Sequence, residues 1–313
     1  MGALLVVAVV AIAILVPSRD GRRLAGTPSL IPLPDDPVVG DCLLEPTADF
    51  FADIRQAPAE PPTSSSVDRN VARPGPAPVF GRCAGSVAGE VVAIISAVGD
   101  TAARRLQIAN SGLDCRAAAL DYAGLVQNDG NYSIPGATAV DPVLWRLSVD
   151  LRGTWVLPGE LLQATGRSWA ACVVAPTSPE RYSGTIAGAY RDGRLPDAFG
   201  TCWDLPESSA RIQTLPCNEP HQAELISSGR VPDRAATTAM AIQQSCEELA
   251  AGVMRRTDPT AGGGITVRVS PETLDSQTRR AANLDVVCFV IPTEHSLAGT
   301  VVGIGDRPIP YAG

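Results

Sequence analysis

Gly40-Asp-Cys42-Leu-Leu-Glu-Pro46 and Gly200-Thr-Cys202-Trp-Asp-Leu-Pro206 are two copies of one short pattern, in which glycine precedes a cysteine by two positions and proline follows it by four. Further matches follow each copy in the same order. A cysteine with a glutamate seven positions later comes next, as Cys83 with Glu90 and as Cys217 with Glu224. Such ordered self-similarity indicates an internal repeat.

The rest of the repeat contains the remaining cysteines. Cys115 and Cys246 each lie in a segment with helical periodicity, and Cys172-Val-Val-Ala-Pro176 then matches Cys288-Phe-Val-Ile-Pro292. The tails 184–188 (GTIAG) and 299–303 (GTVVG) also correspond. The repeat therefore accounts for all eight cysteines and predicts two domains, 38–195 and 196–313.

The two copies differ mainly in the spacing of their first two cysteines. Residues 52–78 of the first copy are rich in proline and serine and have no apolar periodicity, so we expect a disordered insert that cannot repay its ordering entropy by burial. Residues 18–37 are expected to be a linker of the same kind.

Periodicity predicts the structure of each copy. In 233–256, Ile242, Cys246, Leu249 and Val253 share one helical face, with Asp233 as a candidate cap, and Cys115, Ala119, Tyr122 and Val126 repeat the spacing. Residues 90–97 and 285–291 are short, rich in Val and Ile and typical of buried strands. We expect an α+β fold in which each domain has the order strand, strand, helix, strand, strand, with one main helix packed on an antiparallel sheet.

The cysteines are most simply explained as disulfides. If each copy bonds within itself and both copies use one pattern, three schemes remain, and we favour Cys42–Cys83, Cys115–Cys172, Cys202–Cys217 and Cys246–Cys288 because the helix cysteine faces the last strand. Persistent disulfides need an oxidising compartment. A zinc site and a redox site are the alternatives, but the chain has no CxxC pair.

Residues 3–16 (ALLVVAVVAIAILV) are uninterruptedly apolar, which predicts a membrane-inserting segment within 1–17. Arg19, Arg22 and Arg23 follow this run, and the positive-inside tendency would hold that end in the cytoplasm, against the disulfide argument. We therefore expect either a signal anchor or a truncated signal peptide whose basic start precedes Met1.

Composition excludes some function classes. The chain is 45% hydrophobic and 19% charged, which predicts folded domains, and its 25 basic residues are all arginine. With a net charge of -8, the chain would on average repel nucleic acid, which we do not expect as a partner.

The second copy resembles the septum-formation-related domain family of actinobacterial membrane proteins, through GTCW (200–203), PCNEPHQAE (216–224), Cys246 and VVCFV (286–290). The first copy is more diverged, with Ser86-Val87 in place of Pro-His and no Trp after Cys42. The resemblance implies an extracytoplasmic location behind a membrane segment, in the cell envelope, and a link to septum formation or cell division. It implies no catalytic residue and no cofactor.

The candidate binding residues are His221, Glu224 and Trp203. His221 and Glu224 form H-x-x-E, which in a hydrolase would do acid–base work, but on a strand these positions face opposite sides. A structural role, such as a hydrogen bond that fixes the turn after Cys217, is the simpler explanation.

We therefore expect a membrane-anchored, non-enzymatic interaction module that binds an envelope protein or a cell-wall polymer. A hydrolase and a structural or sensor domain are the alternatives.

Overall fold

The computed structural model of the chain describes residues 33–46, 50, 77–99, 101–128, 131–133, 142–204, 213–232, 237–271 and 284–313. The expected membrane segment, most of the linker and residues 52–76 of the expected insert lie outside these ranges. Within them, no helix is both long enough and apolar enough to span a bilayer. The end of the expected linker is packed, because Arg167 donates to the carbonyl of Pro34 and pairs with Asp36 at 3.0 Å.

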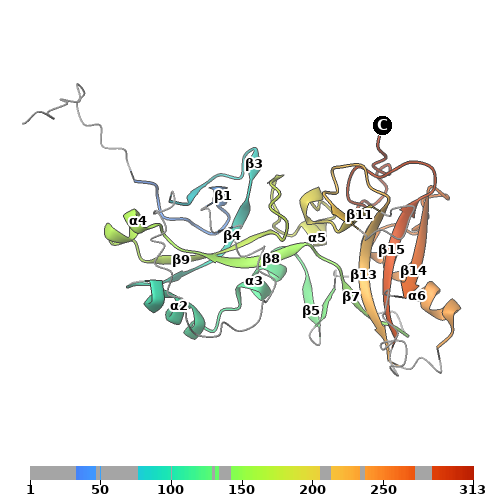
Figure 1. The fold of residues 1–313 in the computed structure, drawn as a ribbon, viewed down its shortest axis with the longest axis horizontal. Helices are drawn as coiled ribbons and strands as arrows, with labels where there is room; N and C mark the ends of the chain where they lie inside the picture. The colour runs from blue at the N-terminus through green and yellow to red at the C-terminus, as the bar shows by residue number, and fades with distance from the viewer. Residues whose placement is uncertain are drawn as a thin grey trace, which may run out of the picture. The chain divides into compact units, whose positions relative to one another are not determined.

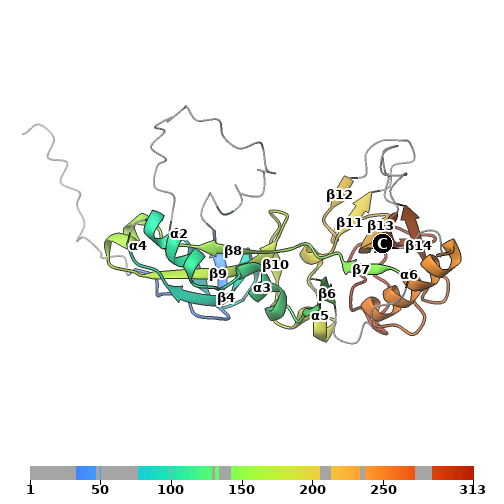
Figure 2. The same cartoon turned by 90° about the horizontal axis from the view of Figure 1, so that it is seen from below.

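The fold is α+β, as expected, and its main elements are two antiparallel sheets (Figures 1 and 2). Sheet 1 has the order β2-β1-β4-β9-β8. Its strands are β1 (Cys42–Glu45), β2 (Val79–Gly81), β4 (Gly89–Ser96), β8 (Leu151–Val156) and β9 (Trp169–Pro176). Sheet 2 has the order β12-β11-β13-β15-β14 and is built from β11 (Cys202–Asp204), β12 (Gln213–Leu215), β13 (Ala223–Val231), β14 (Ile265–Pro271) and β15 (Leu284–Pro292).

The two sheets share one topology and one register. Cys42 pairs with Glu90 in sheet 1, and Cys202 pairs with Glu224 in sheet 2. In both sheets a bulge follows this glutamate by one to three positions, and the residue after the bulge pairs with the last cysteine of its repeat, Cys172 or Cys288. Each repeat thus contributes three strands to its main sheet before its main helix, where periodicity had predicted two.

One main helix packs on each sheet. In the second repeat α6 (Ala239–Met254) is capped by the Thr238 hydroxyl, which accepts from the Ala241 amide at 3.1 Å. Its buried face includes Ile242, Cys246, Leu249 and Val253, as predicted. The expected cap, Asp233, lies outside the described residues.

The first repeat divides its helical segment in two. α2 (Thr101–Asn110) and α3 (Cys115–Tyr122) are separated by a turn at Gly112, whose φ is +70°. α3 begins at its cysteine, capped by Asp114, and ends at Tyr122. The prediction that Val126 continues this helix is wrong, because Val126 starts β5 (Val126–Asn128), which pairs with β6 (Asn131–Ser133).

The remaining elements are short. They are β3 (Ser86–Val87) and β10 (Tyr182–Ser183), which pair, β7 (Leu144–Leu147), α4 (Glu160–Ala164), α5 (Ala189–Asp192) and the 3-10 turn η3 (Asp197–Phe199). One of these strands crosses between the two repeats. β7 belongs to the first repeat by sequence, yet it pairs with β13 and makes sheet 2 six-stranded.

All eight cysteines form the favoured disulfides, Cys42–Cys83, Cys115–Cys172, Cys202–Cys217 and Cys246–Cys288. In each repeat the first bridge joins the first strand to the residue two positions after the second strand, and the second bridge joins the main helix to β9 or β15. The Cα–Cα distances of the second bridges are 5.5 and 5.6 Å. Each bridge lies within one repeat, as the sequence predicted.

An outer edge of sheet 2 is closed by a side chain. The amide nitrogen of Gln243 on α6 donates to the Val267 carbonyl at 2.9 Å, and its oxygen accepts from the Val269 amide at 3.1 Å. The side chain therefore makes the two hydrogen bonds that a neighbouring strand would make to β14, which protects this edge from pairing with another chain.

Candidate functional site

Each repeat has a buried glutamate beside its first disulfide. Glu90 is 2% exposed and Glu224 is fully buried. In each case the carboxylate and the two cysteine sulfurs lie within 4.8 Å of one another, as Cys42, Cys83 and Glu90 and as Cys202, Cys217 and Glu224. Because both sulfurs of each group are in a disulfide, neither can be the thiolate that binds metals, and the carboxylate is the one ordinary metal ligand of each group.

Both glutamates bind the tail of their own repeat. Glu224 accepts hydrogen bonds from the Thr300 hydroxyl and from the Val301 amide, the latter at 2.6 Å. Glu90 accepts from the Thr185 hydroxyl at 2.8 Å and from the Ile186 amide at 2.9 Å. The matching tails 184–188 and 299–303 are therefore the partners of the matching glutamates, which explains why the repeat keeps both.

The carboxyl of Glu224 has an unusual environment. Burial raises its pKa to about 7, although the hydrogen bonds from Thr300 and Val301 lower it. A Cβ added at Gly200 would lie 2.5 Å from the Cys217 sulfur and 3.1 Å from a Glu224 carboxylate oxygen. Gly200 is thus required for this close approach. Gly40, its counterpart in the first repeat, has open space around the position of a Cβ, and its φ of +92° is what favours glycine there.

His221 is a core residue. It is 1% exposed, and its backbone pairs with Leu297 through two hydrogen bonds of 2.9 Å. Its Nδ1 donates to the Glu219 carbonyl at 2.8 Å, in the turn after Cys217. Burial lowers the pKa of the imidazole, which favours the neutral ring.

The residue equivalent to His221 in the first repeat is Val87. Val87 precedes Glu90 by three residues, as His221 precedes Glu224, and it pairs with Tyr182 as His221 pairs with Leu297. A valine therefore fills the same core place. The Nε2 atom of His221 is buried and has no hydrogen-bond partner.

Trp203 does not join these two residues. It pairs with Ala223 on β13, one position from the Cys202–Glu224 pair, so its side chain lies on the opposite face of sheet 2. The indole is half-buried. Of the three candidate binding residues, His221 and Glu224 serve the interior of the second repeat, and only Trp203 faces away from it.

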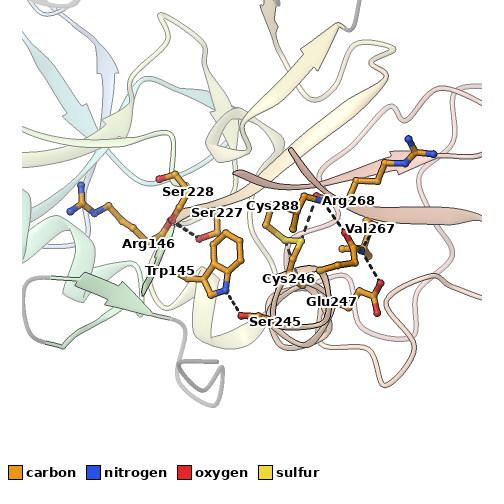
Figure 3. The surroundings of a disulfide bond; sticks show 12 residues. Trp145, Arg146, Ser227, Ser228, Ser245, Cys246, Glu247, Val267, Arg268 and Cys288 are labelled. Atoms are coloured by element: carbon orange, nitrogen blue, oxygen red, sulfur yellow. Dashed lines mark hydrogen bonds between the residues drawn. A yellow bond between two sulfur atoms is a disulfide. The ribbon is translucent and has the colours of Figure 1, made fainter. Parts of the chain in front are cut away.

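Sequence reasoning missed the role of Trp145. Its indole nitrogen donates to the Ser245 hydroxyl of α6 at 2.7 Å, beside the Cys246–Cys288 bridge (Figure 3). A Cβ at Gly229 would lie 2.5 Å from the indole, so β13 has room for the ring only because this position is glycine. The alternating burial of β7 signals a strand, but it does not reveal which sheet the strand joins.

Acidic side chains gather around Glu180. Burial raises the pKa of Glu180, and the charges of Asp150, Glu219 and Asp197 raise it further. Burial also raises the pKa of Asp150 to about 6. Two of these carboxyls come from each repeat. Among the described residues, however, the only groups of three ligand atoms close enough to hold a metal are the two Cys–Cys–Glu groups.

A pocket of about 240 Å³ lies at the end of β15. It is lined by Gln222, Ile291, Pro292, Thr293, Glu294, His295 and Ser296. The ring of His295 meets the ring of Tyr311 edge to face, with centroids 5.7 Å apart. This pocket, which sequence reasoning did not find, is formed by a turn and has no periodicity to reveal it.

Comparison with known proteins gives no relative: no family model, no curated protein and no solved structure matches the chain.

Proposed function

We propose that this chain is a membrane-tethered, non-enzymatic interaction module of the cell envelope. The observation that carries the proposal is the pair of disulfides enclosed within each of two repeats. Each bridge closes a loop of 15 residues or more, and such bridges stabilise a small domain only where thiols stay oxidised. An extracytoplasmic place for residues 34–313 agrees with this chemistry.

The two glutamates and His221 have structural roles, which weigh against catalysis at these residues. Both carboxylates are used to hold tails, and His221 holds a turn. A hydrolase at His221 and Glu224 would need their side chains to meet substrate, but both are buried. The alternative hydrolase has no supporting observation at this pair.

Two further features of the sequence agree with the proposal. The apolar run 3–16 would provide the membrane tether. The resemblance of the second repeat to the septum-formation-related domain family suggests the envelope and a partner that acts in septum formation or cell division. The family membership and the link to division stay predictions.

Photocrosslinking in the host tests the proposal. Because the chain contains no lysine, amine-reactive reagents label it poorly, so a photoreactive side chain should replace Met240, which is 80% exposed, or Leu161, which is 65% exposed. We expect light-dependent adducts with a specific envelope protein or with wall material. The same side chain in place of the fully buried Leu120 is the control. Adducts with cytoplasmic proteins only, or none from any exposed position, would overturn the proposal.

A further inference from the structure

We propose that the pocket at the end of β15 binds one ring of a neutral carbohydrate chain. The inference rests on the proposed function and deepens it, since it selects a polysaccharide as the ligand and names the surface that binds it. Neither His221 nor Glu224 takes part.

The pocket presents polar groups that the protein does not use. In the ranges the structure describes, the amide of Gln222, the carboxylate of Glu294 and the imidazole of His295 make no hydrogen bond to the protein. All three residues are exposed and line one pocket. An amide offers both donors and acceptors, a carboxylate accepts and an imidazole does either, so the group can bind hydroxyls that both donate and accept.

The ring of Tyr311, which is not among the residues that line the pocket, contacts one of these groups, His295. Tyr311 is 37% exposed, and its hydroxyl donates to the Gly264 carbonyl at 2.9 Å, which fixes the ring next to His295. Ile291 follows Val290, which pairs with Glu224, so its side chain lies on the same sheet face as Trp203. An aromatic ring with a polar tip provides a flat apolar surface for the C–H face of a sugar ring.

The size of the pocket fits one unit of a chain. Sites for whole drug-sized ligands have volumes of roughly 300–1,000 Å³, and this pocket is smaller. A single ring held in the pocket, with the neighbouring rings on the surface beside it, is the binding mode that this volume allows.

The negative charge of the pocket lining and of the whole chain favours a neutral polymer as the ligand. The pocket lining contains no arginine, and Glu294 is its one formal charge. The whole chain has a net charge of -8. A polymer rich in phosphate or carboxylate groups would be repelled, whereas a neutral glycan would not. A peptide is less well matched, because an anchoring apolar side chain would meet only two aliphatic residues of the lining, Ile291 and Pro292.

Saturation-transfer NMR on the full chain, with its disulfides intact, tests the inference. The probes are tetra-N-acetylchitotetraose and maltotetraose, two neutral tetrasaccharides. We expect saturation transfer to at least one of them. Tyr311→Ala should abolish the transfer, because it removes the stacking surface. Gln222→Ala should weaken binding about fivefold to tenfold, which is the effect of losing one hydrogen bond.

A matched control and the melting temperatures separate binding from folding. Met240→Ala changes an exposed residue of α6 outside the pocket lining, so it should keep the transfer. All variants should retain the wild-type melting temperature within a few degrees. If Tyr311→Ala does not fold, Gln222→Ala, which changes an exposed side chain, decides the outcome.

The inference is overturned if neither tetrasaccharide receives saturation, or if both Tyr311→Ala and Gln222→Ala bind the sugar with unchanged affinity. A photoreactive side chain in place of His295 that crosslinks to a protein, with no transfer to either sugar, would also overturn it. In that case the proposed interaction module would stand with a protein partner. Absence of envelope adducts from every position would instead remove the proposed function itself.

Discussion

At the scale of the residue, one buried carboxylate in each repeat holds the tail of that repeat in place. Glu90 and Glu224 both lie beside the first disulfide and bind a threonine hydroxyl and the next backbone amide of the tail. Each tail also buries apolar side chains in the core, Ile186 in the first repeat and Val301 and Val302 in the second, and the carboxylate holds the backbone that carries them. The spacing of seven between cysteine and glutamate could be found in the sequence, but its partner could not, because Thr185 and Thr300 are more than 70 positions away.

The pH dependence of folding tests the state of Glu224. Its pKa is about 7 in the folded chain and has an ordinary value of 4.5. A raised carboxyl pKa stabilises the fold below pH 4.5, and this contribution is lost as the pH rises towards 7. We expect a loss of about 3 kcal/mol in the free energy of unfolding across this range.

Glu224→Gln should remove this contribution while its amide keeps partners in Thr300 and Val301. Urea unfolding at several pH values measures the effect. Asp150 also has a raised pKa and acts in the same direction, so the difference between wild type and variant isolates Glu224. Parallel curves for the two proteins between pH 4.5 and 7 would show that the carboxyl titrates normally.

At the scale of the element, β7 shows how the sequence repeat and the sheets differ. Its residues lie between α3 and β8 in the first repeat, but they pair with Ser227–Arg230 of β13. Periodicity locates strands and helices because the alternation of buried and exposed residues can be seen within a short stretch of sequence. For this reason β4, β15 and the buried face of α6 were predictable. The partner of a strand depends on distant residues, here Gly229 and Ser245, and local patterns do not contain it.

Trp145 anchors β7 to the second repeat. Trp145→Ala removes a buried indole and its hydrogen bond to Ser245, so we expect a loss of about 3–5 kcal/mol in the free energy of unfolding. Trp155→Ala, on half-buried β8, is the control and should cost less. Equal losses for the two variants in urea unfolding would argue against an anchoring role for β7.

Gln243 is expected to protect the edge of β14. Gln243→Ala removes both hydrogen bonds to this edge, so the Val269 amide should exchange with deuterium at least several-fold faster. Gln244→Ala is the matched control, because Gln244 binds Glu248 on the same helix and not the strand. Hydrogen exchange followed by mass spectrometry resolves the two cases, and unchanged exchange at Val269 would contradict the assignment.

At the scale of the whole molecule, the chain is one strand arrangement used twice. Disulfide pairing, the α+β class and the order of equivalent elements were predictable, because both copies must share one cysteine pairing and one order of elements. The pocket at the end of β15 was not predictable, although Ile291 and Pro292 belong to the repeat pattern, because most of its lining comes from a turn, which has no periodicity of burial. Arg104 could not be predicted either, because arginine is mostly exposed in folded proteins, yet Arg104 is 3% exposed and donates to the carbonyls of Gly99 and Arg167.

The two bridges of the second repeat should differ in their effects. The Cys246–Cys288 bridge closes a loop of 42 residues and the Cys202–Cys217 bridge closes one of 15. In the chain-entropy account of disulfides, removing them by paired Cys→Ala substitutions costs about 4 and about 3 kcal/mol. Urea unfolding of the two double variants measures this, and a larger loss from the shorter loop would show that packing outweighs entropy.

Non-reducing peptide mapping of the chain recovered from its host tests the central claim most directly. Cleavage at arginine places each of the eight cysteines in its own peptide, so every bridge appears as a linked pair. We expect the four pairs Cys42–Cys83, Cys115–Cys172, Cys202–Cys217 and Cys246–Cys288. Free thiols, or a pair that joins the first repeat to the second, would contradict two self-contained disulfide repeats in an oxidising compartment.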